Sequence, residues 1–395
     1  MQNTKVLISG ASVAGPALAY WLGHYGFEPT VVELAPALRE GGYAVDFRGT
    51  SHLSVLERMG VLEELRELQT GGSPWSFVDQ DGRELLGLPR EFTGGDLEVR
   101  RADLSRVLYR RSLDRTEYLF GDSIATLTDT AEGVRVSFEH GPDRLFDLVI
   151  GADGIHSNTR RLTFGPEEQF VRHLGYYVAG WDVPNHLGLT GGSVTYNVPG
   201  KAAGVGVDTR DTSRGNAMFL FASPKLDIHY RDRARQQQVL TEAFAGLGWE
   251  TPRLLAGLAD SREFYFDSIS RADLPTWSKG RIALVGDAAA GATLGGMGTG
   301  AAILAAYTLA GELATANGDF RAAYTAYENR LRSFATRCQK GGDRAGHFIA
   351  PRRGYGARLR NTLLGRPALL NMMLREGQKV AADMALPDYP AALAA

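Results

Sequence analysis

The first residues whose types and spacing could do chemistry form the stretch GASVAG at positions 10–15, which nearly matches the dinucleotide-binding pattern G-x-G-x-x-G. Gly10 and Gly15 occupy its outer positions, and Ser12 stands where the middle glycine is usual. In such a site the glycines permit a tight turn, close approach of a pyrophosphate and close packing of helix on strand. Ser12 is small enough for the middle position, and its hydroxyl can cap the helix or bind a phosphate oxygen. We therefore expect a phosphate cradle that also includes Ala14.

A carboxylate follows at Glu33, about twenty residues beyond the cradle, where the dinucleotide-binding pattern has its ribose ligand. A carboxylate accepts hydrogen bonds from both ribose hydroxyls and repels a 2′-phosphate. Glu33 therefore favours the ADP half of NAD or FAD over NADP, and it does not choose between NAD and FAD. An exposed glutamate at a strand end is the alternative.

The elements that must position these residues form a βαβ unit, predicted as a strand at 5–9, a helix at 13–25 and a strand at 29–33. Further along, the patterns predict a β-meander over 117–151 and a β-rich, aromatic layer over 175–269 with a helical insert at 232–248. A buried strand at 281–287, a glycine loop, a helix at 299–315 and a helical C-terminal part follow.

Composition limits the function classes. The 395 residues carry a net charge of −2 with a pI near 6.5, which disfavours nucleic acid and anionic membranes as partners. The single cysteine, Cys338, forms no internal disulfide, and no Cys/His spacing suggests a metal site. No signal-peptide pattern precedes the first strand, so we expect a cytoplasmic protein. The apolar run 282–313 contains Asp287 and many glycines, which argues against a membrane span.

Two later stretches carry a resemblance to a known family. DLVIGADGIHSNTRR at 147–161 resembles the DG motif, and RIALVGDAAAGATLGGMG at 281–298 resembles the GD motif, of the group A flavoprotein monooxygenases related to p-hydroxybenzoate hydroxylase. Their order and separation match that family over essentially the whole chain. ISGASVAGPALAYWL, GGYAVDFRG and EVRRADLSRVL look most like the branch of tetracycline-inactivating and antibiotic-tailoring monooxygenases.

The resemblance implies FAD as cofactor, with Asp287 on the flavin ribitol or pyrophosphate. A loop-capping aspartate is the alternative. The following loop would lie against the isoalloxazine ring, and the next helix would direct its positive end at flavin N1 and C2=O. This loop departs from the family pattern in having Ala290 and Leu294 instead of histidine and proline, and in being about one residue short. The loop residues expected at the flavin are Gly295, Gly296, Met297, Gly298 and Gly300.

The resemblance also assigns charged residues elsewhere. Asp153, with Gly154 and Arg160, matches the DG motif, which contacts the flavin side and is implicated in nicotinamide binding. A strand-ending turn with a solvated arginine is the alternative reading of that motif.

Two more arginines are implied near the cofactor. Arg101 matches the arginine that reaches the FAD pyrophosphate, and Arg100 is the neighbouring alternative. Arg48, two residues after Asp46, would meet the flavin ring or the phosphates, with a surface salt bridge as the alternative.

The fold implied is α/β (α+β overall), a Rossmann-like FAD-binding domain with an interleaved β-sheet substrate domain and a C-terminal helix. The FAD-binding domain is expected at 1–75, 96–172 and 269–340, the substrate domain as a hairpin at 76–95 and a β-rich part at 173–268, and a helical segment at 341–395.

Aromatic residues at alternate positions of the β-rich part predict one wall of a substrate pocket, with a plain hydrophobic core as the alternative. Arg48, Tyr176 and His173 are candidate catalytic residues, and His229 is a further candidate for orienting substrate. No catalytic base is assigned, because the cofactor carries the difficult step. The predicted wall consists of Tyr177, Trp181, Tyr196, Phe219, Phe221, Phe264 and Phe266.

The function implied is hydroxylation of an aromatic or polyketide-like molecule by NADH or NADPH and O2, through a flavin C4a-hydroperoxide. No second glycine pattern lies between a strand and a helix, so the reductant has no dinucleotide fold of its own. A flavin halogenase is one alternative, although the pattern W-x-W-x-I-P is missing and WDVP at Trp181 replaces it poorly. A redox-silent flavin- or ligand-binding protein is the other. The expected partners are an aromatic or polycyclic substrate and O2, with the chain a monomer or homodimer.

Overall fold

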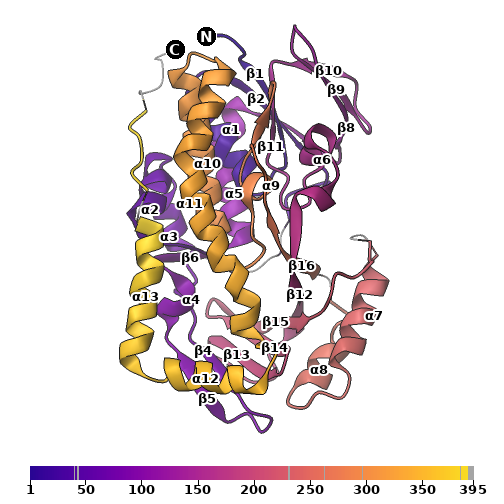
Figure 1. The fold of residues 1–395 in the computed structure, drawn as a ribbon, viewed down its shortest axis with the longest axis vertical. Helices are drawn as coiled ribbons and strands as arrows, with labels where there is room; N and C mark the ends of the chain where they lie inside the picture. Colours follow the sequence, from indigo (N-terminus) through magenta and orange to yellow (C-terminus); the bar gives the residue numbers. More distant parts are fainter. Residues whose placement is uncertain are drawn as a thin grey trace.

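The computed structural model describes residues 1–39, 41, 44–229, 232–261, 263–295, 297–382 and 384–389. Figure 1 shows two sheets stacked along the long axis of the molecule, with the long helix α11 (Phe320–Ile349) running from one to the other. At about 1.5 Å per residue, these 30 residues span roughly 45 Å.

The upper sheet contains six strands in the order β17-β18-β11-β1-β2-β7. Here β1 (Lys5–Ser9) pairs in parallel with both β2 (Glu28–Glu33) and β11 (Leu148–Gly151), and β11 pairs in parallel with β18 (Ile282–Leu284). The carboxyl ends of these strands therefore meet at one edge, where open α/β sheets bind their ligands. The outer strands are β7 (Glu117–Phe120) and β17 (Ser278–Lys279).

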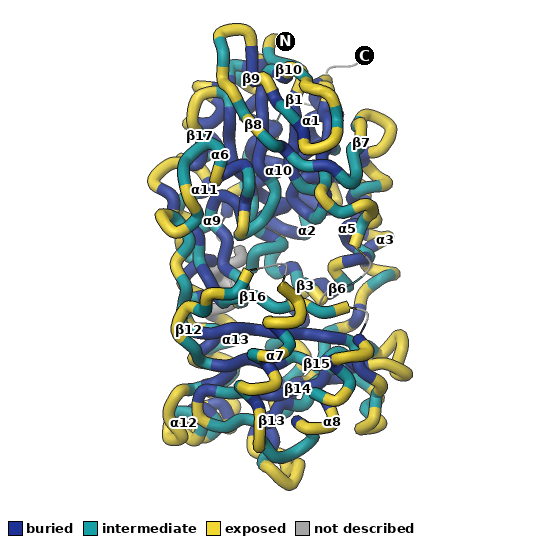
Figure 2. The backbone as a smooth tube through the Cα atoms, turned by 90° about the vertical axis from the view of Figure 1, so that its right-hand side faces the viewer, coloured by how far each residue is buried: buried dark blue, intermediate teal, exposed yellow. Residues whose placement is uncertain are grey.

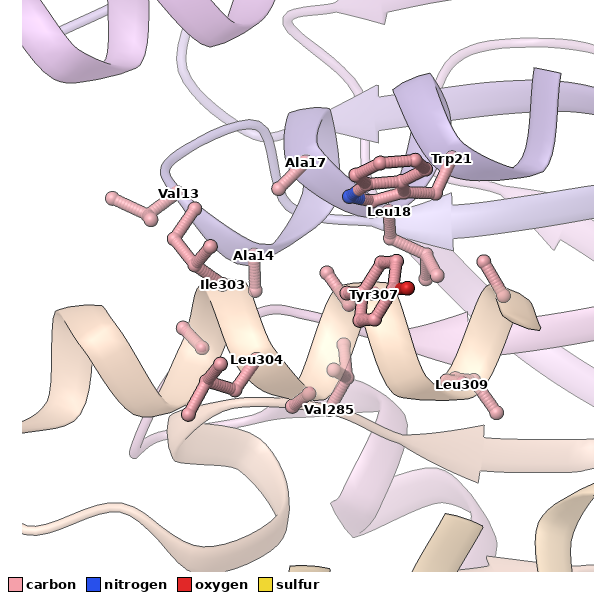
Figure 3. Packing of buried hydrophobic residues seen from close by; sticks show 14 of the residues in the cluster. Val13, Ala14, Ala17, Leu18, Trp21, Val285, Ile303, Leu304, Tyr307 and Leu309 are labelled. Carbon is pink, nitrogen blue, oxygen red and sulfur yellow. The ribbon is translucent and has the colours of Figure 1, made fainter. Parts of the chain in front are cut away.

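Helix α1 (Ala14–His24) follows β1 and packs on α10 (Gly298–Thr315) and on α5 (Arg101–Ser112). Figure 3 shows Leu18 and Trp21 of α1 facing Ile303 and Tyr307 of α10, and the rings of Trp21 and Tyr307 lie 4.9 Å apart. The α/β class and the βαβ unit expected from the sequence are confirmed.

The lower sheet contains seven strands in the order β16-β12-β15-β14-β13-β4-β5. All neighbours are antiparallel except β13 and β4, which are parallel and pair residues far apart in sequence, such as Ser193 with Trp75. The strands are β4 (Trp75–Val78), β5 (Glu84–Leu88), β12 (Val171–Pro184), β13 (Gly192–Val198), β14 (Lys201–Asp208), β15 (Asp211–Ala222) and β16 (Phe264–Ala272).

Different helices cover the two faces of this sheet. Side chains of α7 (Arg233–Phe244) and α8 (Thr251–Ala256) share one hydrophobic cluster with one face. The end of α11 and α12 (Gly354–Leu364) share another cluster with the opposite face. Figure 2 shows buried residues running through both sheets and exposed residues mostly in the outer loops.

The C-terminal part returns from the lower sheet to the upper one, as Figure 1 shows in yellow. Helix α13 (Pro367–Ala382) packs on α2 (Gly49–Arg58), and beyond it the Ser51 hydroxyl donates to the carbonyl of Met384. Among the described residues, we find no helix with both the length and the apolar character needed to cross a bilayer.

The remaining elements complete the chain. They are β3 (Ala44–Phe47), α3 (Leu62–Glu67), α4 (Arg90–Gly94), β6 (Leu97–Arg100), η1 (Leu113–Arg115), β8 (Ile124–Asp129), β9 (Val134–Phe138), β10 (Arg144–Phe146), α6 (Asn158–Phe164), η2 (Glu167–Gln169) and α9 (Asp287–Ala290).

Candidate cofactor and active site

The GASVAG stretch forms a tight turn between β1 and α1 that only glycine fits at two positions. Gly10 has φ +107°, and a Cβ there would lie 2.6 Å from the carbonyl oxygen of Ala152. A Cβ on Gly15 would lie 1.8 Å from the carbonyl oxygen of Gly10. The first turn of α1 therefore sits directly against the end of β1, and its N–H groups, which have no intrahelical acceptor, face the edge of the sheet.

Ser12 and Ala14 have different surroundings in this turn. The Ser12 hydroxyl accepts from Nε and Nη2 of Arg101, at 3.3 and 2.9 Å, so it contacts an arginine instead of capping α1. Ala14 is buried, and a Cβ on Gly286 would lie 3.2 Å from its methyl group. Ala14 therefore sets the distance between α1 and the loop that follows β18.

The Glu33 carboxylate lies beside the turn. Its Oε2 accepts from the Ala11 N–H at 2.8 Å, and its Oε1 accepts from the Ala35 N–H at 2.9 Å. Glu33 is the last residue of β2 and is half-buried. The two backbone bonds fix the carboxylate at the carboxyl edge of the sheet, next to the cradle.

A pocket of about 310 Å³ opens next to Glu33, and the sequence analysis did not anticipate it. Phe120 in its wall pairs with Glu33 across β2 and β7. The Phe120 ring lies 5.9 Å from that of Tyr109, which α5 contributes. The apolar spacing of α5 could have indicated this wall, but only the pairing of β2 with β7 brings it to Glu33. The lining residues are Pro36, Ala37, Leu38, Arg39, Ala102, Arg106, Tyr109 and Phe120.

Arg100 and Arg101 point to different parts of the molecule. Arg101 begins α5 and reaches Ser12 of the cradle. The Arg100 Nε donates to Asp208 in β14, at 2.6 Å, and so ties β6 to the lower sheet. Of the two, Arg101 is the one that contacts the cradle.

Asp287 is the first residue of α9, and Val285 and Gly286 separate it from the end of β18. A Cβ on Gly298 would lie 3.1 Å from its Oδ1, so the start of α10 adjoins the carboxyl group. Burial raises the pKa of Asp287, and the charge of Arg101 opposes that shift. A hydroxyl or cationic partner would stabilise the ionised form of a buried carboxyl group such as this one.

The loop from Gly291 to Met297 adjoins this carboxyl group. Met297 has φ +51°, a left-handed conformation that is rare for residues other than glycine and often marks a functional site. Gly295 also has a positive φ of 69°, and Gly296 lies outside the described residues. Gly300 leaves room for the buried side chain of His52, because a Cβ on Gly300 would lie 2.3 Å from Cε1 of His52.

The DG-motif aspartate is bound by its own loop. Asp153 accepts from the N–H and the hydroxyl of Thr159, both at 2.8 Å, and from the hydroxyl of Ser157. Ser9 of β1 adds a longer bond of 3.4 Å. Asp153 therefore fixes the start of α6 against β1.

Arg160 is fully buried, so the reading of a solvated arginine in this motif is wrong. Its Nη1 donates to the carbonyl of Ala288 at 3.1 Å, and its Nη2 donates to that of Ile155 at 2.5 Å. Arg160 thereby ties the DG loop to α9, whose first residue is Asp287.

His156, which the sequence analysis passed over, joins three segments. Its Nδ1 lies 3.0 Å from both carboxylate oxygens of Glu167, and its Nε2 lies 2.9 Å from Asp267 of β16. Burial alone would lower the pKa of His156, but the hydrogen bonds and charges of Asp267 and Glu167 outweigh it and raise the pKa to about 10. His156 is therefore charged at neutral pH.

We expect this contact to stabilise the protein in a pH-dependent way. Because the pKa is about 10 in the folded state and about 6.5 in the unfolded state, the contribution is complete below pH 6.5 and disappears as the pH rises to about 10. Melting temperatures of the wild type and of His156→Gln, measured from pH 6 to pH 10, should converge with rising pH. His186→Gln, in an exposed turn, is the control. A gap that stays constant with pH would contradict this assignment.

Arg48 follows β3 and is bonded to several residues of the protein. Its Nε donates to Asp46, and its Nη2 donates to the carbonyls of Phe92 and Thr93, at 3.0 and 3.3 Å. The salt bridge anticipated as an alternative is therefore present, although it is largely buried. The backbone N–H of Arg48 donates to Nδ1 of His52, at 3.1 Å.

The expected aromatic wall lies under α7 and α8. The Tyr177 hydroxyl accepts from the N–H of Leu226 at 2.8 Å, and Trp181 Nε1 donates to the carbonyl of Leu254 at 3.2 Å. The period-two pattern is present, but the face that these rings share is covered by two helices and forms a core. The rings placed there are Tyr177, Trp181, Phe219, Phe221, Phe264 and Phe266, with Tyr196 beside Trp249.

The opposite face of the sheet is turned to the glycine loop, because Leu294 of that loop packs in its cluster. The rings of Phe92 and Phe348 stack there at 5.6 Å, and the ring of Trp75 lies 6.3 Å from Phe348. Met218 of β15 is partly exposed on the same face. The sequence analysis missed this group, which we call the apolar face: Trp75, Phe92, Met218, Leu294 and Phe348.

Tyr176 and His173 are bonded within the protein. The Tyr176 hydroxyl lies 2.8 Å from Nδ1 of His347 and donates to the carbonyl of Ala350 at 3.1 Å, which anchors α11 to β12. The Nε2 of His173 lies 2.9 Å from the carbonyl oxygen of Ser223. Burial raises the pKa of Tyr176, so its hydroxyl stays protonated.

Comparison with known proteins gives consistent results. The family model described as "FAD binding domain" matches residues 3–341. An uncharacterised protein of Mycobacterium tuberculosis is 45% identical over 341 residues, which cover 85% of this chain and 91% of that protein. A flavin-dependent monooxygenase of Legionella longbeachae is 38% identical, covering 86% of this chain and 88% of that one. The crystal structure of the tetracycline destructase Tet(51) superposes with a TM-score of 0.86 at 32% identity, over 98% and 100% of the two chains.

Proposed function

Because this chain belongs to the FAD binding domain family and is a flavin-dependent monooxygenase, we propose that it uses NADH or NADPH and O2 to hydroxylate an aromatic or polyketide-like small molecule. One observation carries the proposal furthest. The cradle, Glu33 and Asp287 all lie at the carboxyl edge of the upper sheet, and the loop after Asp287 contributes Leu294 to the apolar face of the lower sheet.

The residues present fit FAD. The turn at Gly10 and Gly15 leaves no room for side chains, so a pyrophosphate could approach the N-terminus of α1 with Arg101 beside it. Glu33 would hold the adenine ribose, and the adjacent pocket with Tyr109 and Phe120 would take the adenine ring.

Asp287 and the start of α10 would hold the ribityl and pyrimidine side of FAD. A hydroxyl partner for the buried carboxyl group would lower its raised pKa. FAD, when bound, supplies electron transfer and the activation of oxygen.

The chain's own residues would orient substrate and exclude water. The N-terminal end of α10 carries a partial positive charge that favours negative charge nearby. The rings of Trp75, Phe92 and Phe348, which share a cluster with Leu294 of the glycine loop, would offer stacking to a flat apolar molecule and would help to exclude water. The likeness to a tetracycline destructase supports a polycyclic polyketide as the first compound to test.

The test uses the purified protein with its bound flavin. Acid precipitation should release FAD into the supernatant, and a turnover mixture with NADPH or NADH should place an oxygen atom from ¹⁸O2 in the product. Oxygen uptake that yields only hydrogen peroxide with every aromatic or polycyclic compound tried would contradict the proposed hydroxylation. A product that forms only when chloride or bromide is present would instead support the halogenase alternative. Bound flavin with no oxidation of NADH or NADPH would support the alternative of a redox-silent binding protein.

Removing the Glu33 carboxylate should weaken FAD binding while the fold persists. We expect Glu33→Ala to cost about 1–3 kcal/mol of binding free energy, the range for a hydrogen-bonding group that loses its partner. Titration of the apoprotein with FAD, followed by flavin fluorescence, measures the change. Glu28→Ala, at the exposed start of the same strand, removes an equal charge and is the control. Equal FAD affinities for the two variants would show that Glu33 does not bind the cofactor.

A further inference from the structure

A small cavity lies between α9, α10 and α11, beside the candidate cofactor site. Its volume is about 30 Å³. The cavity exists because alanines occupy the positions where these helices and the loop after α9 meet, so their side chains do not fill the space. Those alanines are Ala289, Ala290, Ala292, Ala301, Ala305 and Ala335.

Most of the wall of the cavity is apolar. Leu331 and Phe334 of α11 close one side. The ring of Tyr327 also lines it, but the hydroxyl of that residue donates to the carbonyl of Leu284 at 3.1 Å. Cys338 contributes a thiol whose pKa burial raises to about 12, so it is neutral. A water needs two to four polar partners, and cavities with walls of this kind stay dry and accept apolar atoms such as xenon.

One end of the cavity reaches the candidate cofactor site. Gly286, Asp287 and Gly298 line both, and Asp287 is the one charged residue among the lining residues that the structure describes. The helix end that faces the proposed flavin is the start of α10, and Gly298, Ala301 and Ala305 share the side of α10 that lines the cavity. A small molecule leaving the cavity past Gly298 would therefore enter the cofactor site.

We propose that this cavity is a binding site for dioxygen, from which O2 reaches the reduced cofactor. Dioxygen is uncharged and apolar, so an apolar cavity concentrates it relative to water. The cavity is too small for an aromatic substrate or a nicotinamide and too poor in polar partners for an ion. The inference goes beyond the proposed function because it concerns the route of O2, and it holds for any compound that the enzyme hydroxylates.

The first test is independent of turnover. Crystals of the FAD-loaded protein under xenon pressure should show xenon between Ala305 and Phe334. Ala305→Val fills the cavity from α10, and Ala335→Val fills it from α11, so each should remove the xenon peak. Ala314→Val, at a partly buried position of α10 outside the cavity, is the matched control and should leave the peak unchanged. Ordered water in the cavity instead of xenon would overturn the proposal.

The second test measures oxygen reactivity without substrate or nicotinamide. Enzyme reduced with dithionite is mixed with oxygenated buffer, and flavin absorbance gives the second-order rate constant. We expect Ala305→Val and Ala335→Val to lower it by roughly three- to tenfold, a barrier increase of about 0.7 to 1.4 kcal/mol, and Ala314→Val to leave it unchanged. Unchanged rates in variants that no longer bind xenon would refute the proposal. The hydroxylation assay would be unaffected by that outcome, so the two ideas fail separately.

Discussion

Gly15→Ala should yield a protein that no longer retains flavin. The new methyl group would lie 1.8 Å from the carbonyl oxygen of Gly10, well inside contact distance, and the nearest atoms belong to the backbone, which cannot turn aside as a side chain could. Relief requires α1 to move away from β1, which would displace the N–H groups proposed to face the pyrophosphate. Overpacking of this kind costs about 1–3 kcal/mol, and the upper value corresponds to roughly a hundredfold loss of affinity.

The comparison variant is Gly354→Ala, at the start of α12. There the nearest heavy atom to an added Cβ is Cγ of Pro199 at 3.8 Å, an ordinary contact. Flavin content per chain after gel filtration, with circular dichroism to verify the fold, distinguishes the two variants. Gly15→Ala that retains flavin as the wild type does would show that the cradle is not the phosphate site.

Arg160→Ala should cause the largest loss of stability of any single arginine substitution in the DG motif. The carbonyl oxygens of Ala288 and Ile155 would lose charged donors, and the fully buried side chain would leave a void. Leaving a buried acceptor without its donor costs about 1–3 kcal/mol, and the void left by the side chain adds to that cost. Because the lost bonds join the DG loop to α9, flavin retention should fall together with stability.

Arg161→Ala is the matched control, one residue along the same helix. The Arg161 side chain is exposed and binds only Asn158 among the described residues, at 3.2 and 2.6 Å. We expect a change of at most about 0.5 kcal/mol there. Urea unfolding followed by tryptophan fluorescence gives both values, and similar midpoints for the two variants would contradict the role assigned to Arg160.

Local sequence determined the cradle. Strand β1 begins and ends where the apolar run 5–9 does, and α1 and β2 differ from the expected 13–25 and 29–33 by one residue at each displaced end. These elements depend on short-range periodicity and on turn residues, which act between neighbours in the chain. For the same reason the apolar run 282–313 was correctly read as strand, glycine loop and helix, now β18, the loop around α9, and α10.

Only the tertiary structure decided which side of each element faces the site. Alternation placed Phe219 and Phe221 on one face of β15, but the helices that cover that face, α7 and α8, come from a later part of the chain. Met218, on the other face, instead shares a cluster with Leu294 of the glycine loop. The same holds for Arg160, whose acceptor Ala288 is 128 residues away, and for Gly300, whose neighbour His52 comes from α2. Period and spacing fix relations along one element, whereas the partner of a face is chosen by packing between elements that are distant in sequence.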